Sequence, residues 1–489
     1  MDPLNLSGTF WFPGSEAAAV HGTLVFDPAD GCILTLTEPL KAVTGITGRR
    51  EDIGGLRERV FGVVDRTGYQ VRITLGDCLW LSAKRYHINF ILLEGHFAAD
   101  DTVFDQVSVR LQDLPVWVGQ DALTDDVGTA LGDVDRREFV VQLDRPPMFA
   151  APFGRGELRL DFRWEREDVE FEQLTIRQWP QFELHYAERT SLQEVMGDVV
   201  GLRSLVGLCA DRFGSIQEVK LYRSDHPQRA LSGDAFSGTM QKVTLLTQFG
   251  GVTSGHLDRC LELHQLLATF EDIGGIATAA RWLDNYAKLK IITAFMGTMR
   301  ADGMFGANRF LNVCSAAEGF HRTTVGGRYM DDEDFQVLKE KLKAQVPQEH
   351  LNWFSGITSH ANDPSLNRRL KELAAQLDGV AEQLVGDVVV WGRVVSTCRN
   401  ESTHLDGDRE EDDSPDLFYL AEGVFNVMRL CLLLHAGMDR AMLPKVANSR
   451  PASRFRDRPA EAAKRLDAAQ KVRQREKKAQ AAAGSRAQS

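Results

Sequence analysis

The stretch LRLDFRW, residues 158–164, alternates apolar and polar side chains at every position. A period of two is the pattern of an extended strand that buries one face and exposes the other. The same alternation occurs in VRITL at residues 71–75 and in VSVRL at residues 107–111, and it dominates from about residue 10 to about residue 186. We therefore predict that residues 1–190 form antiparallel strands, arranged as a β-sandwich or as a barrel-like domain.

One turn within this region predicts which strands pair. Asp30 and Gly31 separate the apolar stretches 23–26 and 33–36. Both residue types tolerate the positive φ angles that tight hairpin turns need. The sequence therefore predicts a β-hairpin across residues 23–36.

The period changes from that of a strand to that of a helix at Ser191. Ser191 and Glu194 have the spacing of a capping box, which marks the start of a helix. The predicted apolar face of this helix comprises Leu192, Val195, Met196, Val199, Leu202 and Leu205.

The residues that follow this helix mix the two periods. Helical patterns cover residues 256–270 and 277–300, whereas 216–222 and 242–246 are candidate strands. Because helical patterns predominate, we interpret residues 191–300 as a mostly helical connector that belongs to the N-terminal region.

Beyond residue 301 the patterns are helical. The predicted helical segments are 308–321, 331–346, 365–377, an apolar stripe from Leu384 to Cys398, and a helix that Ser414-Pro415 opens. Short connections favour neighbouring helices within one bundle. We therefore predict an all-α bundle over residues 301–445, and an α+β protein overall.

The charge of the chain is unevenly distributed. The formal net charge is -12, yet the last 40 residues hold 12 Lys/Arg against 4 Asp/Glu, which leaves about -20 on the rest. Residues 446–489 have helix propensity but almost no apolar stripe, so we expect a basic, disordered tail that folds only on a partner. The tail could bind RNA through phosphates, it could be a solvated extension, or it could dock on the acidic body of the protein.

The cysteines and the apolar segments bear on cofactors and location. The seven cysteines show no CxxC or CxxH pairing that would suit zinc, and we expect no metal or other cofactor. The N-terminus lacks the features of a secretory signal. The apolar segment 417–438 contains Glu422 and Arg429, which would be costly in a bilayer. We expect a buried helix there, and a cytoplasmic protein that does not contact a membrane.

Between the last two predicted core helices lies RNESTH, residues 399–404, which carries candidate catalytic groups. An arginine binds phosphate through two parallel hydrogen bonds, and a histidine of pKa about 6.5 moves a proton at neutral pH. Arg399 and His404 therefore suit metal-independent cleavage of RNA, whose 2′-hydroxyl supplies the nucleophile. The alternative is a solvated helix end, whose cation interacts with the helix macrodipole.

The spacing of this pair constrains how the two residues could share a site. Positions five residues apart lie about 140° apart around a regular helix. A shared site needs the helix to end or distort between Arg399 and His404, or a second subunit to contribute one of them.

Two segments resemble known families. Residues 387–404, with RN-x3-H after one apolar helix and before another, resemble a HEPN ribonuclease domain. LSGTFWFPG at residues 6–14, followed by GTLVF at 22–26 and CILTL at 32–36, resembles the N-terminal domain of ApeA-type anti-phage proteins. The resemblance implies a bacterial abortive-infection effector, in which an N-terminal sensing region controls a HEPN endoribonuclease.

The resemblance also implies roles for individual residues. Arg399 and His404 match the catalytic pair, and Asn400 matches the polar residue beside the arginine. Glu318, on an earlier helix, could orient the arginine or could be a solvated charge, and His321 could serve similarly or be structural. Ser402 and Thr403 could bind phosphate or cap the helix end.

The partners that the resemblance implies are an RNA substrate, such as transfer or messenger RNA, a phage-derived trigger at the N-terminal region, and a second copy of the chain bound through the HEPN bundle. Cleavage would leave a 2′,3′-cyclic phosphate and a 5′-hydroxyl.

Alternatives remain for both the site and the whole chain. The acidic segment DGDREEDD, residues 406–413, could be a solvated loop or an electrostatic gate that repels RNA in the resting state. The chain as a whole could instead be a non-catalytic HEPN dimerisation or interaction module with a ligand-binding β domain. A carbohydrate-binding β domain with a helical oligomerisation segment is a third possibility.

Overall fold

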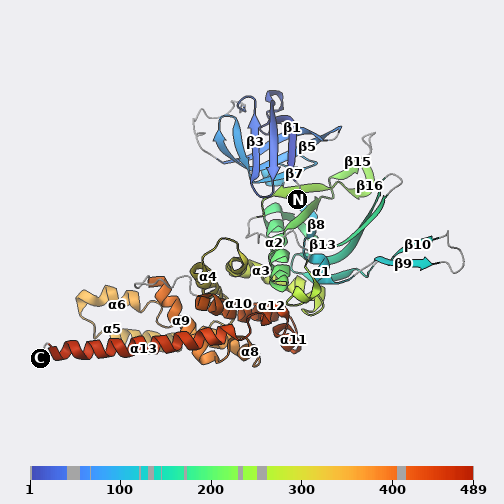
Figure 1. Ribbon diagram of the computed structural model, residues 1–489. Helices are drawn as coiled ribbons and strands as arrows, with labels where there is room; N and C mark the ends of the chain where they lie inside the picture. The colour runs from blue at the N-terminus through green and yellow to red at the C-terminus, as the bar shows by residue number, and fades with distance from the viewer. Residues whose placement is uncertain are drawn as a thin grey trace.

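The computed structural model of the protein has a β-rich N-terminal half and a helical C-terminal half (Figure 1). The residues that the structure describes are 3–40, 56–66, 68–120, 123–129, 137–144, 146–169, 173–229, 235–249, 261–404 and 415–487. Together the two halves confirm the predicted α+β class, and the β-rich part contains a barrel.

Six strands at the N-terminus close into the barrel. They are β1 (Leu4–Trp11), β2 (Val20–Asp27), β3 (Gly31–Leu36), β4 (Leu56–Arg66), β5 (Tyr69–Ser82) and β6 (Arg85–Ile88). Neighbouring strands pair in the order β5-β4-β1-β2-β3-β6, and β6 pairs with β5 to complete the ring. Inward-facing side chains such as Phe10, Leu24 and Leu34 fill the interior. The predicted hairpin is β2–β3, and Gly31 has the positive φ of 95° that the turn needs.

The barrel continues into an open sheet, because β5 changes partner along its length. Its residues 73–76 pair with β7 (Phe90–Leu93), whereas residues 79–82 pair with β6. The change occurs at Gly76 and Asp77, and Asp77 has a positive φ of 49°. A Cβ atom on Gly76 would lie 1.9 Å from the Phe90 ring, so only glycine fits at this crossing.

The open sheet extends from β7 through six further strands. In sheet order these are β17 (Val243–Thr247), β14 (Ile216–Tyr222), β8 (Val103–Leu111), β13 (Gln173–Ser191), β12 (Gly156–Val169) and β11 (Phe149–Phe153). The strand predicted from the alternation in residues 158–164 is confirmed, since Leu158, Leu160 and Phe162 are all buried on one face of β12. Trp164 is 56% exposed, so the buried face ends before it.

Three helices pack on the N-terminal half, namely α1 (Leu114–Val118), α2 (Leu192–Ala210) and α3 (Gly275–Gly297). The predicted capping box opens α2, because the Ser191 hydroxyl accepts from the Glu194 amide and the Glu194 carboxylate accepts from the Ser191 amide. The helix predicted over 256–270 is wrong in its described part, where residues 263–265 form one 3-10 turn. Leu266, Leu267 and Phe270 are buried there from an irregular segment.

Residues 191–300 are more than a mostly helical connector. They supply α2 and α3, but they also supply β14 and β17, which are interior strands of the large sheet. The two candidate strands of the sequence, 216–222 and 242–246, correspond to these elements. This segment is therefore part of the N-terminal fold itself.

The C-terminal half is a bundle around α10 (Pro415–Ala436). The surrounding helices are α4 (Gly306–Thr324), α7 (Leu366–Ala375), α8 (Ala381–Val385), α9 (Val388–His404), α11 (Leu443–Ala447) and α12 (Arg450–Ser453). The connection between α4 and α7 contains two further helices, α5 (Asp332–Lys343) and α6 (Leu351–Ile357). The stripe predicted from Leu384 to Cys398 is split between α8 and α9 at Gly386, whose φ is 72°. Helix α10 is long and apolar enough to cross a membrane, yet 83% of its most apolar window is buried inside the protein, as in a core helix.

The C-terminal tail differs from the expected disorder. Residues 458–487 form helix α13 (Arg458–Ala487), which packs along α9 and α10 (Figure 1). Its contact face includes the buried Ala462 and Ala463 and the partly buried Leu466. Ion pairs from Asp467 to Arg393 and from Arg465 to Asp416 add to this contact. Alanine carries too little apolar surface to mark a buried face in a sequence pattern, so the pattern alone did not indicate this packing.

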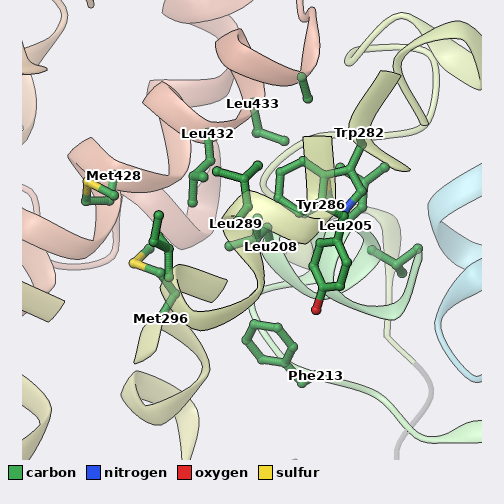
Figure 2. Packing of buried hydrophobic residues seen from close by; sticks show 14 of the residues in the cluster. Leu205, Leu208, Phe213, Trp282, Tyr286, Leu289, Met296, Met428, Leu432 and Leu433 are labelled. Carbon is green, nitrogen blue, oxygen red and sulfur yellow. The ribbon is translucent and has the colours of Figure 1, made fainter. Parts of the chain in front are cut away.

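One hydrophobic core joins the two halves. Leu205 and Leu208 of α2 lie against Trp282, Tyr286 and Leu289 of α3, as Figure 2 shows. The same cluster continues into the bundle through Met428, Leu432 and Leu433 of α10. The β-rich half and the bundle therefore share packed side chains.

Candidate functional site

Helices α4 and α9 bring two of the predicted site residues together. Arg399 Nη2 donates to Glu318 Oε2 at 3.0 Å, although 81 residues separate them in sequence. Arg399 Nη1 donates to Asn400 Oδ1 at 3.2 Å. The structure thus places Glu318, Arg399 and Asn400 in one cluster at the surface of the bundle.

The pair is half-buried. The exposed fraction is 32% for the Arg399 side chain and 24% for the Glu318 side chain. Such an environment strengthens a charge-assisted hydrogen bond relative to water and still lets a ligand approach the guanidinium.

The layer beneath the pair is apolar and unreactive. Cys314 of α4 and Cys398 of α9 are both buried. Burial raises the pKa of the Cys314 thiol, and the neighbouring Glu318 carboxylate raises it further, whereas Arg399 opposes the shift. Cys314 is therefore a protonated packing residue and not a nucleophile.

His404 is the last residue of α9, and its side chain lies outside the described residues. The helix does not end between Arg399 and His404, because residues 400–403 remain helical and Thr403 Oγ1 donates to the Arg399 carbonyl at 2.7 Å. The two positions consequently face directions about 140° apart around α9. Thr403 therefore bonds to the backbone one turn earlier within the helix, and the choice between a capping role and a phosphate contact stays a prediction.

His321, the other candidate on α4, belongs to a buried network. Its side chain is fully buried, Nε2 lies 2.6 Å from Glu372 Oε2, and Nδ1 lies 3.0 Å from Arg369 Nη1. An arginine can only donate, so Nδ1 accepts and Nε2–H donates to the carboxylate, which requires a neutral imidazole. Burial lowers the pKa of His321, in agreement with this assignment, although Glu372 opposes the shift. We assign His321 a structural role.

Arg369 and Glu372 lie on α7 and were missed by sequence reasoning. On an amphipathic helix both residues look like ordinary surface charges, and only the tertiary contact with His321 distinguishes them. Arg369 is 4% exposed, and it borders a cavity of about 740 Å³ together with Arg322 and Arg328. This arginine-bearing cavity begins one helical turn beyond Glu318 on α4, since Arg322 follows Glu318 by four residues.

Helix α13 packs against α9 close to Arg399. Gln470 Nε2 lies 3.7 Å from the sulfur of Cys398, the residue before Arg399. The exposed basic residues Lys471 and Arg473 follow on the same helix. The acidic segment 406–413, predicted to be either a solvated loop or a gate, lies outside the described residues.

Within the described ranges, no three His, Cys, Asp or Glu side chains cluster in ligating geometry.

Two family models match the chain. Residues 5–279, more than half of the sequence, match the model described as ApeA N-terminal domain 1. Residues 311–441, which include Glu318, Arg399 and His404, match the model described as Apea-like HEPN. No curated protein and no solved structure matches the chain.

Proposed function

The chain belongs to the ApeA family, with an ApeA N-terminal domain followed by an Apea-like HEPN domain, and from this we propose that it is an endoribonuclease. The two domains together support an anti-phage HEPN effector. HEPN domains typically dimerise and act on RNA. We propose that this one cleaves RNA in the bacterial cytoplasm during phage infection, after its N-terminal region has sensed a phage component.

The observation that carries the proposal is the Glu318–Arg399 hydrogen bond at 3.0 Å. A solvated helix end would leave the arginine to sample many rotamers, whereas here a carboxylate from another helix fixes the guanidinium. A guanidinium held in one orientation is preorganised to bind a phosphate, and such preorganisation is a large part of electrostatic catalysis. Asn400 adds a second fixed contact to the same guanidinium.

The proposed chemistry follows from the RNA backbone and the two motif residues. The imidazole of one His404 takes the proton from the 2′-hydroxyl, and the oxygen attacks the adjacent phosphorus. Arg399 stabilises the added negative charge on the phosphorane. The bond from phosphorus to the 5′-oxygen breaks, and a protonated imidazole gives that oxygen its proton. The products are a 2′,3′-cyclic phosphate and a 5′-hydroxyl.

The continuity of α9 favours a site completed by a second subunit. Because α9 continues to His404, the 140° separation of positions 399 and 404 is not relieved by a helix end. A dimer that apposes two motifs would supply two arginines and two histidines to one cleft, and one imidazole could then act as base while the other acts as acid.

The test compares RNA cleavage by purified wild type, Arg399→Ala and His404→Ala on total and transfer RNA in EDTA. We expect the wild type to cut and each variant to lose at least about 100-fold in rate, because general acid–base catalysis alone contributes 10²–10⁴-fold. His360→Ala is the matched control, since the His360 side chain is 87% exposed and lies outside the proposed site.

Two outcomes of this test would contradict the proposal. Cleavage that survives both replacements would place the activity elsewhere. No cleavage by the folded, dimeric wild type, even with lysate from infected cells, would support the non-catalytic interaction module.

A further inference from the structure

The open sheet carries a cavity of about 620 Å³ beside the barrel, far in sequence from the HEPN motif. This volume lies within the range of small-molecule sites. Strands β8, β13, β14 and β17 contribute to its walls, and Leu4 of β1 and Arg66 of β4 contribute from the barrel.

The strand registers place polar side chains on the face that lines this cavity. Phe182 pairs with Val109, and both are buried on the opposite face of the sheet. Side chains alternate along strands, so Trp179 and Arg110 lie on the cavity face. Arg110 in turn pairs with Glu218 across β8 and β14.

Arg110 and Trp179 form a stacked pair with unused hydrogen-bond donors. The Arg110 guanidinium carbon lies 4.6 Å from the centroid of the Trp179 ring. Neither Arg110 Nε nor Trp179 Nε1 has a hydrogen-bond partner among the described residues, although both atoms are buried. Burial also lowers the pKa of Arg110, whereas the carboxylates of Glu218 and Glu165 oppose this shift. Buried donors without acceptors are costly, so an acceptor from a ligand would stabilise this pair.

Further cations border the same cavity. Its lining includes Arg66, Arg110, Lys220 and Lys242 against the acids Glu165 and Glu218, a balance of +2. Within the lining, Lys220 Nζ lies 2.6 Å from Glu218 Oε2. An excess of positive charge around a stacked guanidinium matches a ligand with more than one negative charge.

The cavity also has an apolar part. Leu4 and the aromatic residues Trp164 and Trp179 are among the residues that line it. Aromatic and apolar walls with basic groups at the rim are the combination that binds a nucleobase and its phosphates together.

We propose that this cavity binds a nucleoside phosphate, with the base beside Trp179 and the phosphates against Arg110, Arg66 and Lys242. The same chemistry is offered by a free nucleotide and by a segment of single-stranded nucleic acid. The proposal does not depend on the ribonuclease chemistry, because the site lies in the N-terminal half and is tested by binding.

Isothermal titration calorimetry on the full-length protein tests the proposal. The probes are an equimolar set of the four ribonucleoside triphosphates, a thymidine hexanucleotide, which lacks the 2′-hydroxyl needed for cleavage, and inorganic tripolyphosphate. We expect the triphosphates or the hexanucleotide to bind more tightly than tripolyphosphate. Arg110→Gln and Lys242→Gln should each weaken that binding at least about tenfold, since hydrogen bonds to charged groups contribute about 1.5–3 kcal/mol.

Controls keep the result interpretable. Arg72→Gln, on the exposed side of β5, removes a positive charge outside the cavity and should leave binding unchanged. Lys242 is exposed, so Lys242→Gln tests the site even if Arg110→Gln does not fold. Binding of the triphosphates alone would identify a free nucleotide, and binding of the hexanucleotide alone would identify single-stranded nucleic acid. Equal binding of tripolyphosphate, unchanged binding by Lys242→Gln, or no binding of any probe would overturn the proposal.

Discussion

The Glu318 carboxylate holds the Arg399 guanidinium at a surface where about a third of the arginine side chain stays in contact with solvent. We interpret Glu318 as a positioning residue, because it acts through the arginine. By accepting a hydrogen bond from Arg399, Glu318 holds the guanidinium in one orientation in which it can bind a phosphate.

Glu318→Gln tests this role. The amide keeps the size of the side chain but removes the charge, so we expect kcat for RNA cleavage to fall about three- to tenfold while KM changes little. Steady-state kinetics on a defined RNA hairpin measures the split, and Glu318→Asp should recover part of kcat. An unchanged kcat would assign Glu318 to the solvated surface.

The neutral state of His321 predicts a pH dependence of stability. Its pKa is lowered in the folded protein, so between that pKa and about 6.5 the unfolded chain binds a proton that the folded chain does not. The contribution of His321 is therefore present at pH 7.5 and is lost as the pH falls below about 6.5.

His321→Gln checks this dependence, because glutamine does not titrate. The variant should be less stable than wild type at pH 7.5, and the gap between their unfolding free energies should narrow at pH 5.5. Urea unfolding at both values measures the gap, with His360→Gln as the exposed control. A gap that widens at pH 5.5 would mean that His321 is protonated in the folded protein.

Helices α2 and α10 are connected by a buried ionic cluster as well as by apolar packing. Asp211, which follows α2, accepts from Arg429 Nη1 at 2.8 Å and from Arg300 Nε at 3.0 Å. Arg300 Nη1 also donates to Glu422 Oε1 of α10 at 2.6 Å. Arg429 is fully buried, and both its Nε and Nη2 donate to the Leu208 carbonyl at the end of α2. The end of α2 is thereby fixed to the central helix of the bundle.

Asp211→Asn should destabilise the protein by about 2–4 kcal/mol, because it leaves the buried Arg429 without its carboxylate. Asparagine tolerates the left-handed backbone of this position, where φ is 56°, so the change isolates the charge. The control is Asp378→Asn, which removes an ion pair to Arg440 whose side chains are both more than half exposed, and it should cost less than about 0.5 kcal/mol. Thermal unfolding compares the two, and equal effects would contradict a structural role for the cluster.

The strands and helices were largely predictable from periodicity, whereas the closure of the barrel was not. Alternation identifies a strand and its buried face, but the change of partner along β5 depends on a backbone kink at Asp77 and on the approach of Phe90 to Gly76. No local sequence pattern predicts the kink at Asp77 or the approach of Phe90 to Gly76. The packing of α13 was missed for a similar reason, since its fully buried residues include alanines such as Ala462 and Ala463.

The candidate site was predictable only in part. The resemblance to HEPN domains pointed to Arg399, Asn400, His404 and Glu318, and the structure brings the first two and the last together. The roles of Arg369 and Glu372 needed the three-dimensional contact with His321. What the residues do chemically stays a prediction.

In the whole molecule, the N-terminal half and the HEPN bundle share one hydrophobic core and one buried ionic cluster. A ligand that shifts α2 or α3 would therefore also have to move side chains of α10 and α4, the helices that contact α9 and its RN-x3-H motif. Coupling through packed, discrete contacts is the physical route that allosteric control needs. Regulation of the bundle by the N-terminal region, as we propose, would use these contacts.

The most direct test of the account is the chemical identity of the RNA ends after cleavage by the full-length protein in EDTA. We predict a 2′,3′-cyclic phosphate on one fragment and a 5′-hydroxyl on the other, with neither product formed by His404→Ala. Fragments that carry a 5′-phosphate and a 3′-hydroxyl would show that water and not the 2′-hydroxyl is the nucleophile, and would contradict the account.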